Sequence, residues 1–322
     1  MSDSVGVCRS TVVRLVTAAL VVSTFGAPAR GASTLGAQSA TVARGWRVAP
    51  TAAIKIHAPS GTLDVEGWGH DSVAISGTLA SGETLFGGGT LTGLKLGAEG
   101  TARSGATRLL VRVPMESRLV VRSGAANVEV RGVSGTIDVG SASGDVEVSG
   151  DIESVIVESI SGTVHVAATS PSVRARTTRG TLDIAGRIAE AQLTSVSGEV
   201  TVSAQPIGRL RIETVDGRVR VRGRLAAAGS LDVETFGGPV YLEFPPDQRA
   251  ALDLRASGGE ITGRIAPQPG ARAPLDLGTA ASRNGTTVSV ARAIGGGNGP
   301  APPVTVRTFR GRITVDAVRD RS

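Results

Sequence analysis

The chain has 322 residues, of which 40% are hydrophobic, only 2% are aromatic and 44 are glycines. This apolar fraction is sufficient for a core, so the composition excludes a disordered protein. A core with few aromatic residues favours regularly stacked β-structure built from Val, Ile, Leu, Ala and Thr. The net charge of +6 comes mainly from arginines that alternate with acids. Without a basic cluster or stacking aromatics, we expect no binding to nucleic acid.

Residues 1–32 have the features of a secretory signal peptide. Arg9 and Arg14 precede an apolar run at 15–25, and small residues follow this run. The run is too short to cross a bilayer, which requires about 20 residues. We therefore expect cleavage near residue 32 and an extracytoplasmic protein in the periplasm, on the cell surface or secreted.

The chain after this segment contains no cysteine, because Cys8 is the only one in the sequence. The mature protein is therefore expected to have no disulfide and no thiol chemistry. No later segment is long and apolar enough to predict a transmembrane helix. We expect residues 33–45 to form a flexible segment at the mature N-terminus.

A glycine recurs with a fixed pattern of residues around it. Gly162, Gly180 and Gly198 are 18 residues apart, and the spacing is then 19, 21 and 21 up to Gly259. Apolar or small residues lie seven, five and three positions before each glycine, and apolar residues two and four positions after most of them. Alternation with period two predicts strands, and the change of parity at the glycine predicts a bend. Between residues 124 and 144 the glycine spacing is about half as long, which leaves the phase of the repeat open there.

Two short strands and two bends in every 18–21 residues predict an all-β solenoid. In such a single-stranded parallel β-helix, each repeat is one coil that stacks on the next at about 4.8 Å. We expect the solenoid to cover residues 46–316, with its last coil at 304–315. Residues 264–303 are rich in Gly, Pro and Ala and are expected to form an irregular insertion with a hairpin and a flexible loop. Residues 317–322 are expected to be a tail.

A column of hydroxyl residues precedes the glycines by three positions. Its inward parity predicts hydrogen bonds to the turn backbone. A nucleophile would need a base and an orienting group, and no histidine occupies a repeat-related position, so we assign the column a structural role. The column comprises Ser141, Ser159, Thr177, Ser195, Thr214 and Thr235.

The repeat pattern resembles that of a known family. The segment VRVPMESRLVVRSGAANVEVRGVSGTIDVGSASGDVEVSG at 111–150 is followed by repeated G-x-[VIL]-x-[VIL] units, and IKIHAPSGTLDVEGW lies at 54–68. Both are similar to the putative-adhesin domain of exported bacterial proteins, over roughly residues 46–316. The resemblance implies a right-handed single-stranded β-helix and an adhesin-like role, but no functional residues.

Four outward-facing acids form the candidate chemical site. If the coils stack in sequence order, these acids approach one another, with Arg211 beside Asp232 and Arg255 beside Glu234. The set could be a ladder of ion pairs, a Ca²⁺ site or the paired acids of a glycosidase. We favour the ion-pair ladder because of the neighbouring arginines. The four acids are Glu213, Asp232, Glu234 and Asp253.

The remaining candidate residues point to no cofactor. The three histidines, His57, His70 and His165, lack metal-ligand spacing. Trp46 and Trp68 are expected to pack against the first coils. Phe236 and Tyr241 are the other plausible platforms for a sugar.

The sequence thus predicts an exported β-solenoid without enzymatic activity. It would present an adhesin-like binding surface or serve as a structural component of the envelope. Its partner would be an extracytoplasmic ligand such as a polysaccharide or an envelope protein. The alternative function is a β-helical polysaccharide lyase or hydrolase that uses the acidic cluster.

Overall fold

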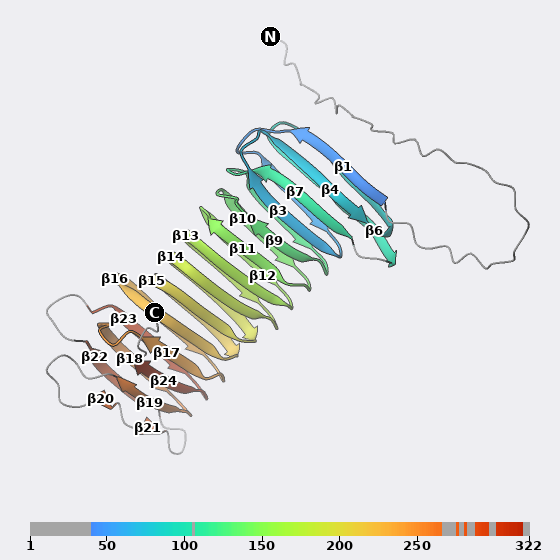
Figure 1. Ribbon diagram of the computed structural model, residues 1–322. Helices are drawn as coiled ribbons and strands as arrows, with labels where there is room; N and C mark the ends of the chain where they lie inside the picture. Colours follow the sequence, from blue (N-terminus) through green and yellow to red (C-terminus); the bar gives the residue numbers. More distant parts are fainter. Residues whose placement is uncertain are drawn as a thin grey trace, which may run out of the picture.

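The structure is a computed structural model that describes residues 40–104, 107–265, 275–276, 280–281, 287–295 and 301–317. These residues form a 24-stranded sheet and contain no helix. Figure 1 shows the strands wound into an elongated stack of coils. The predicted all-β solenoid is therefore confirmed. The predicted signal peptide at 1–32 lies outside the described residues.

One coil illustrates how the sequence pattern builds the stack. Strand β12 (Ser154–Ser159) buries Val155 and Val157, and after the bend at Gly162 strand β13 (Thr163–Thr177) buries Val164 and Val166. The inward parity changes at the glycine, as the repeat predicts. Each coil pairs in parallel with the next, so that the aliphatic side chains stack into one continuous core. Burial of these columns is the main stabilising term of the fold.

Two faces of the stack carry the strands. Face A contains, in spatial order, β5 (Ser81–Gly89), β6 (Gly93–Ser104), β2 (Ala53–Ala58), β8 (Arg118–Ser123), β10 (Thr136–Ser141), β12, the second halves of β13, β14 (Thr181–Ser197), β15 (Val200–Asp216) and β16 (Val219–Thr235), then β23 (Pro303–Thr308), β18 (Ala250–Ala256) and β22 (Val288–Ile294).

Face B is built in the same way from the strands that follow the glycine bend. It contains, in spatial order, β1 (Ala40–Arg47), β4 (Ser72–Leu79), β7 (Arg108–Pro114), β3 (Thr62–Trp68), β9 (Asn127–Arg131), β11 (Val146–Asp151), the first halves of β13 to β16, then β17 (Val240–Phe244), β24 (Arg312–Ala317), β19 (Glu260–Ile265) and the short β20 (Leu275–Asp276) and β21 (Ala280–Ala281).

The C-terminal coil does not lie at the end of the stack. Strand β23 pairs with β16 on one side and β18 on the other, and β24 lies between β17 and β19. The expectation of a last coil stacked after the insertion is therefore wrong. The coil formed by β18 and β19 is outermost, and Figure 1 shows β23 and β24 among the earlier strands.

The N-terminal end has the same arrangement. Strands β2 and β3 lie between the β8–β9 coil and the β6–β7 coil, although β6 and β7 come later in the sequence. Residues 40–45, which we expected to be flexible, form most of β1 and pair antiparallel with β4. The phase left open between residues 124 and 144 is now defined. Gly124 and Gly144 lie at the bend before face B, and Gly135 lies at the other bend.

Antiparallel strands cover both ends of the stack. At the N-terminal end β5 pairs with β6 and β4 pairs with β7, and at the C-terminal end β22 pairs with β18. The insertion at 264–303 thus supplies the capping strands β20, β21 and β22. Its residues 264, 265 and 303 belong to β19 and β23, residues 287, 295, 301 and 302 are also described, and the others lie outside the described part. Trp46 packs closely against Gly87 of β5, in agreement with its predicted role in the first coils. Such caps remove the parallel sheet edges that favour aggregation.

The corner glycines are required by close approach of neighbouring coils. A Cβ atom at Gly180 would overlap the carbonyl oxygen of Gly162, and a Cβ at Gly198 would overlap that of Gly180. Gly162 also has a positive φ of 105°, whereas Gly180 is not among the glycines with positive φ. The same overlap links Gly238 to Gly311 and Gly311 to Gly259, so the glycine column follows the spatial order of the coils. Close packing, more than backbone freedom, selects glycine here.

The hydroxyl column has the structural role that the sequence predicts. Thr177 accepts a hydrogen bond from the backbone N–H of Gly180 at 2.9 Å, and Thr308 accepts one from Gly311 at 2.8 Å. Ser159 instead donates to the carbonyl oxygen of Ser161 at 2.9 Å. Four members of the column thus bond backbone groups at the bends, namely Ser141, Ser159, Thr177 and Thr235. Within the part of the chain that the structure describes, no helix is long and apolar enough to span a membrane.

Candidate functional site

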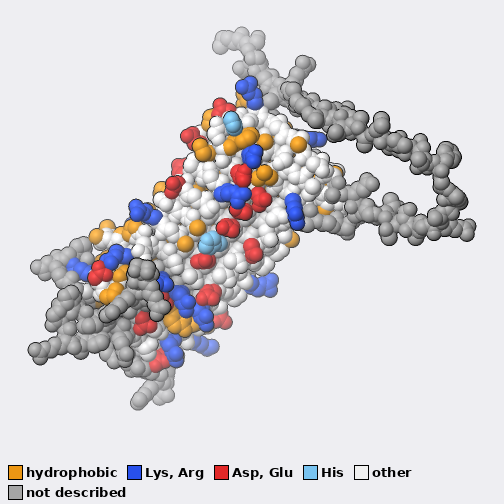
Figure 2. All heavy atoms as spheres, viewed as in Figure 1, with side chains coloured by type: hydrophobic (Ala, Val, Ile, Leu, Met, Phe, Trp, Pro, Cys, Tyr) orange, Lys and Arg blue, Asp and Glu red, His pale blue; other side chains and the backbone are white. Residues whose placement is uncertain are grey.

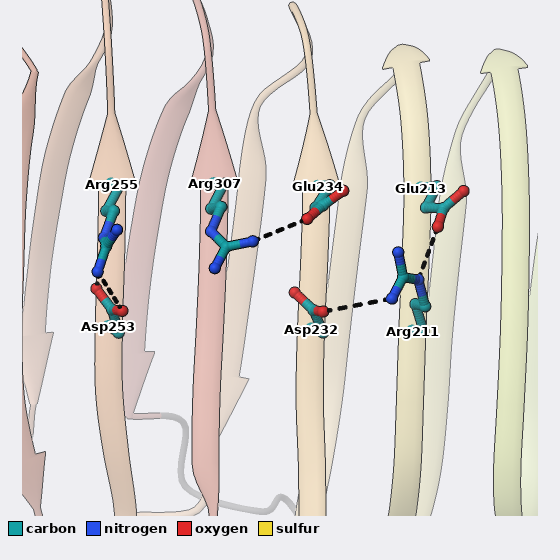
Figure 3. Close-up of polar contacts among 7 residues, drawn as sticks. All are labelled: Arg211, Glu213, Asp232, Glu234, Asp253, Arg255 and Arg307. Carbon is teal, nitrogen blue, oxygen red and sulfur yellow. Dashed lines mark hydrogen bonds and ion pairs between the residues drawn. The ribbon is translucent and has the colours of Figure 1, made fainter.

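The outward side chains of face A form a ladder of ion pairs, drawn in Figure 3. On β15, the Nε of Arg211 lies 2.7 Å from an oxygen of Glu213, and its Nη1 lies 3.9 Å from Asp232 of β16. The Arg211–Asp232 neighbourhood agrees with the sequence prediction. These side chains are all more than a third exposed, so each pair contributes at most about 1 kcal/mol to stability.

The partner of Glu234 differs from the expected one. Its carboxylate lies 3.0 Å from Arg307 of β23, because the C-terminal coil occupies the position next to β16. Arg255 instead pairs with Asp253 on its own strand at 2.9 Å. Figure 3 shows Arg307 between the two strands that carry Glu234 and Arg255.

The inserted coil also separates two of the four candidate acids. Thr305 of β23 pairs in register with both Asp232 and Asp253, which are therefore two strand spacings apart. Each of the four candidates lies within 4 Å of an arginine. Among the described residues, no three His, Cys, Asp or Glu side chains are grouped so that they could hold a metal ion.

A groove runs beside this ladder, along the bend between the faces. It has a volume of about 590 Å³ and crosses five neighbouring coils, those of β14, β15, β16, β23 and β18. We call it the corner groove. One wall is polar and consists of Thr194, Glu213, Glu234 and Arg307, and the other wall is mainly apolar and consists of Val196, Val215, Phe236, Phe309 and Ser257.

The apolar wall belongs to a longer column of exposed side chains. Val196, Val215, Phe236 and Phe309 are 47–51% exposed. Ile160 occupies the same column farther along the stack, separated from Val196 by Thr178. All five occupy the second position before a corner glycine. Exposed large apolar residues in a row mark an interaction surface more often than scattered ones do.

Two phenylalanines from distant parts of the sequence meet in this wall. The rings of Phe236 and Phe309 stack with centroids 5.0 Å apart and an interplanar angle of 15°. The guanidinium carbon of Arg310 lies 5.7 Å from each centroid, a cation–π arrangement. The sequence identified Phe236 as a possible platform but missed Phe309 and Arg307. Their positions relative to Gly311 matched the repeat, but the expected order of coils separated them from Phe236.

The floor of the groove is formed by the hydroxyl column. Ser195, Thr214, Thr235 and Thr308 line it between the two walls. The hydroxyl oxygens of Ser195 and Thr214 have no hydrogen-bond partner among the described residues. These buried hydroxyls close the base of the groove, and its polar contacts come from the polar wall.

Face B carries mixed charges, and Figure 2 shows acidic, basic and histidine side chains interspersed on the visible face. His165 Nδ1 lies 3.0 Å from Asp183 on the next coil, and both side chains are partly exposed. The ring of His70 packs edge-on against Trp68, with the two centroids 4.9 Å apart. Among the described residues, His70 makes no contact with His57. These histidines form no metal site within the described residues.

Strand β3 carries two carboxyls whose pKa values shift in opposite directions. Burial raises the pKa of Asp64, and repulsion from Glu129 adds to this effect. Hydrogen bonds from Arg131 and Arg112 lower the pKa of Glu66. Ionised Asp64 therefore opposes folding at neutral pH, whereas ionised Glu66 favours it.

We expect Asp64→Asn to raise the urea midpoint at pH 7. This gain should shrink as the pH falls below the raised folded pKa of Asp64, and it should vanish once the pH is below the ordinary pKa of the unfolded chain. The reason is that protonation removes the same unfavourable charge. Glu66→Gln on the same strand is the matched variant of opposite sign. It should lower the midpoint at pH 7, and the difference should vanish as the pH falls through the depressed folded pKa of Glu66. Equal effects of both variants at pH 7 would contradict the assigned causes.

The geometry defines a β-solenoid with a groove along one corner. The family model described as Toastrack DUF4097 matches residues 63–268. The chain therefore belongs to the Toastrack DUF4097 family, and the resemblance seen in the sequence is confirmed.

Several solved structures are similar to this chain. A putative adhesin from Bacteroides fragilis has 12% identity and a TM-score of 0.42, covering 87% of this chain and 97% of that one. A putative adhesin from Parabacteroides merdae has 10% identity and a TM-score of 0.41, covering 87% and 96%. A putative lipid binding protein from Parabacteroides distasonis has 7% identity and a TM-score of 0.29, covering 87% and 97%. No curated protein matches the chain in sequence.

Proposed function

We propose that this protein is an exported, non-enzymatic binding protein that engages an extracytoplasmic partner through the corner groove. The solenoid serves as a rigid scaffold, and the groove runs along its axis across successive coils. The proposal includes the right-handed, single-stranded winding that the family resemblance implies, and export by the N-terminal segment.

One observation carries the proposal. Four exposed apolar side chains, two of them stacked phenylalanines, line one wall of a groove that is continuous over five coils. A hydrophobic row of this kind exposes apolar surface to water without a benefit for folding. A partner that covers the row removes this cost.

The alternative function, a polysaccharide lyase or hydrolase, finds less support. Glycosidases need two carboxyls placed on either side of the scissile bond, one of them free to act as acid. In the corner groove, Glu213 pairs with Arg211 and Glu234 pairs with Arg307. Both carboxylates of the groove are thus engaged by arginines, and neither stands free beside the space that a scissile bond would occupy.

Binding and depolymerisation should be measured together on protein purified after export, with its N-terminus determined by mass spectrometry. On an array of polysaccharides and envelope fractions, we expect binding without release of reducing ends. The double variant Phe236→Ser, Phe309→Ser should lose about tenfold in affinity. The matched control is Leu91→Ser, Met115→Ser, which changes two apolar residues of similar exposure, 56% and 46%, outside the groove.

Release of reducing ends that disappears in Glu234→Gln would overturn the non-enzymatic assignment. Binding that the groove variant and the control variant retain equally would place the binding surface elsewhere.

A further inference from the structure

We propose that the ligand of the corner groove is an unbranched, uncharged polysaccharide that lies along the solenoid axis with one sugar unit per coil. This inference rests on the proposed function and adds the chemical class and the direction of the ligand.

The two walls of the groove match the two kinds of surface on a sugar. A pyranose ring presents C–H groups on its faces and hydroxyl groups around its edge. The apolar wall, with Val215 and Phe236, can cover the C–H surface. The polar wall, with Glu213, Glu234 and Arg307, offers acceptors and donors to the hydroxyls.

The period of the groove matches a chain of sugars. Successive coils lie about 4.8 Å apart, which is close to the length of one unit in a β-1,4-linked chain. Thr194, Glu213, Glu234 and Arg307 occupy equivalent positions on four successive coils. A polymer that runs along the axis therefore meets one polar group and one residue of the opposite wall for each sugar.

An added peptide strand does not fit, because the backbone at this corner is already bonded. The N–H of Phe309 donates to the carbonyl oxygen of Thr235 at 3.2 Å, and the N–H of Arg310 donates to that of Phe236 at 2.8 Å. The preceding coil repeats the pattern, since the N–H of Gly237 donates to Val215 at 2.8 Å. Strand addition relies on free main-chain groups at a sheet edge. Side chains alone must therefore recognise the ligand.

A second copy of the chain is also a poor occupant. The four apolar side chains of the groove are about half exposed, so they offer roughly 300 Å² of apolar surface. A stable protein–protein interface buries about 800 Å² on each partner, of which about 450 Å² is apolar. A narrow linear ligand fits the groove better than a broad protein surface does.

The charge balance favours an uncharged polymer. Glu213 and Glu234 are each paired with an arginine, at 2.7 and 3.0 Å. Paired groups can still hydrogen-bond to hydroxyls, but the pairs provide no net charge for a polyanion or a polycation. Arg310 lies over the two phenylalanine rings and is not one of the residues that line the groove. Binding should therefore depend little on salt.

The test measures binding of oligosaccharides of increasing length by calorimetry. The probes are β-1,4-linked chains of glucose and of N-acetylglucosamine, from two to eight units. Affinity should rise with length up to about four or five units and then level off, because four coils carry both walls and Ser257 of a fifth coil extends the groove. Phe236→Ser should lower the affinity about tenfold, and Glu234→Gln should lower it as well, whereas the control Leu91→Ser should not.

Three outcomes would overturn the polysaccharide proposal. They are failure of both oligosaccharide series to bind, affinity that does not depend on chain length, and full binding by Phe236→Ser. A parallel assay with vesicles of phosphatidylcholine and phosphatidylglycerol separates the two proposals. Binding of vesicles but not sugars, lost in Phe236→Ser, would refute the sugar class and leave the binding function standing. Absence of groove-dependent binding to both probes and to every component of the array would refute both.

Discussion

Replacing Gly180 by valine is expected to destabilise the protein by about 3 kcal/mol or more, one of the largest effects of any single substitution in the chain. A Cβ at this position would overlap the carbonyl oxygen of Gly162 and lie 2.9 Å from the hydroxyl of Thr177. The coils are held in register by ladder hydrogen bonds on both sides of the bend, so the backbone cannot move apart locally. A decrease in the urea midpoint measures the effect.

Two further variants separate close approach from other causes. Gly180→Ala adds only the Cβ, so it should already lose most of the stability that valine loses. Gly69→Val is the matched control, because a Cβ at Gly69 meets no atom within 4 Å. It should change stability by less than about 0.5 kcal/mol. Parental stability of Gly180→Ala would show that contact with Gly162 does not select the glycine.

The sequence predicts the cross-section of one coil well, because residues close together in the sequence determine it. The alternation on either side of Gly162 determines which side chains point inward, and the parity change determines the bend. Val155 and Val164 are fully buried as the pattern requires. The reason why position 180 requires glycine is harder to predict, because the close approach involves the neighbouring coil. The sequence alone suggests only a flexible bend.

The order of the coils is much harder to predict from the sequence. Every coil presents the same ladder of backbone groups and the same aliphatic columns, so the local pattern fits several neighbours. Leu231 would match Leu252 as well as it matches Val304, its partner in the structure. The choice depends on the long connections and the end caps, which carry few strand signals. The sequence order of coils is therefore the simplest expectation, and it is wrong at both ends.

The candidate site is hard to predict from the sequence wherever it depends on the order of the coils. The ion pair between Arg211 and Asp232 connects coils that are adjacent in sequence, and it follows from the repeat. The stacked pair of Phe236 and Phe309 connects residues 73 positions apart in sequence, and it exists only because the C-terminal coil is inserted. The order of the coils brings these residues together, and they do not form a contiguous motif. No short sequence pattern therefore identifies the binding surface.

Removal of the C-terminal coil should therefore affect the middle of the stack rather than its end. A chain that stops after Pro302 lacks Val304, Val306, Ile313 and Val315, all at most 1% exposed. Burial of each contributes about 1.5–3 kcal/mol, so the loss should exceed about 6 kcal/mol. It should appear as a lower urea midpoint and as faster hydrogen exchange in β18 and β19, which lose their parallel neighbours. A chain that stops after Ala317 is the matched control and should retain the parental stability.

The order of the coils can be tested directly by disulfide formation in a Cys8→Ser background. Asp232→Cys combined with Thr305→Cys joins residues paired on adjacent strands. Their Cα atoms lie about 4.8 Å apart, which is within the range of a disulfide. Asp232→Cys combined with Asp253→Cys spans two strand spacings, about 9.6 Å, and should stay reduced under mild oxidation. The reverse result would mean that β18 stacks directly on β16, and the pair of Phe236 and Phe309, with the groove that depends on it, would then not form.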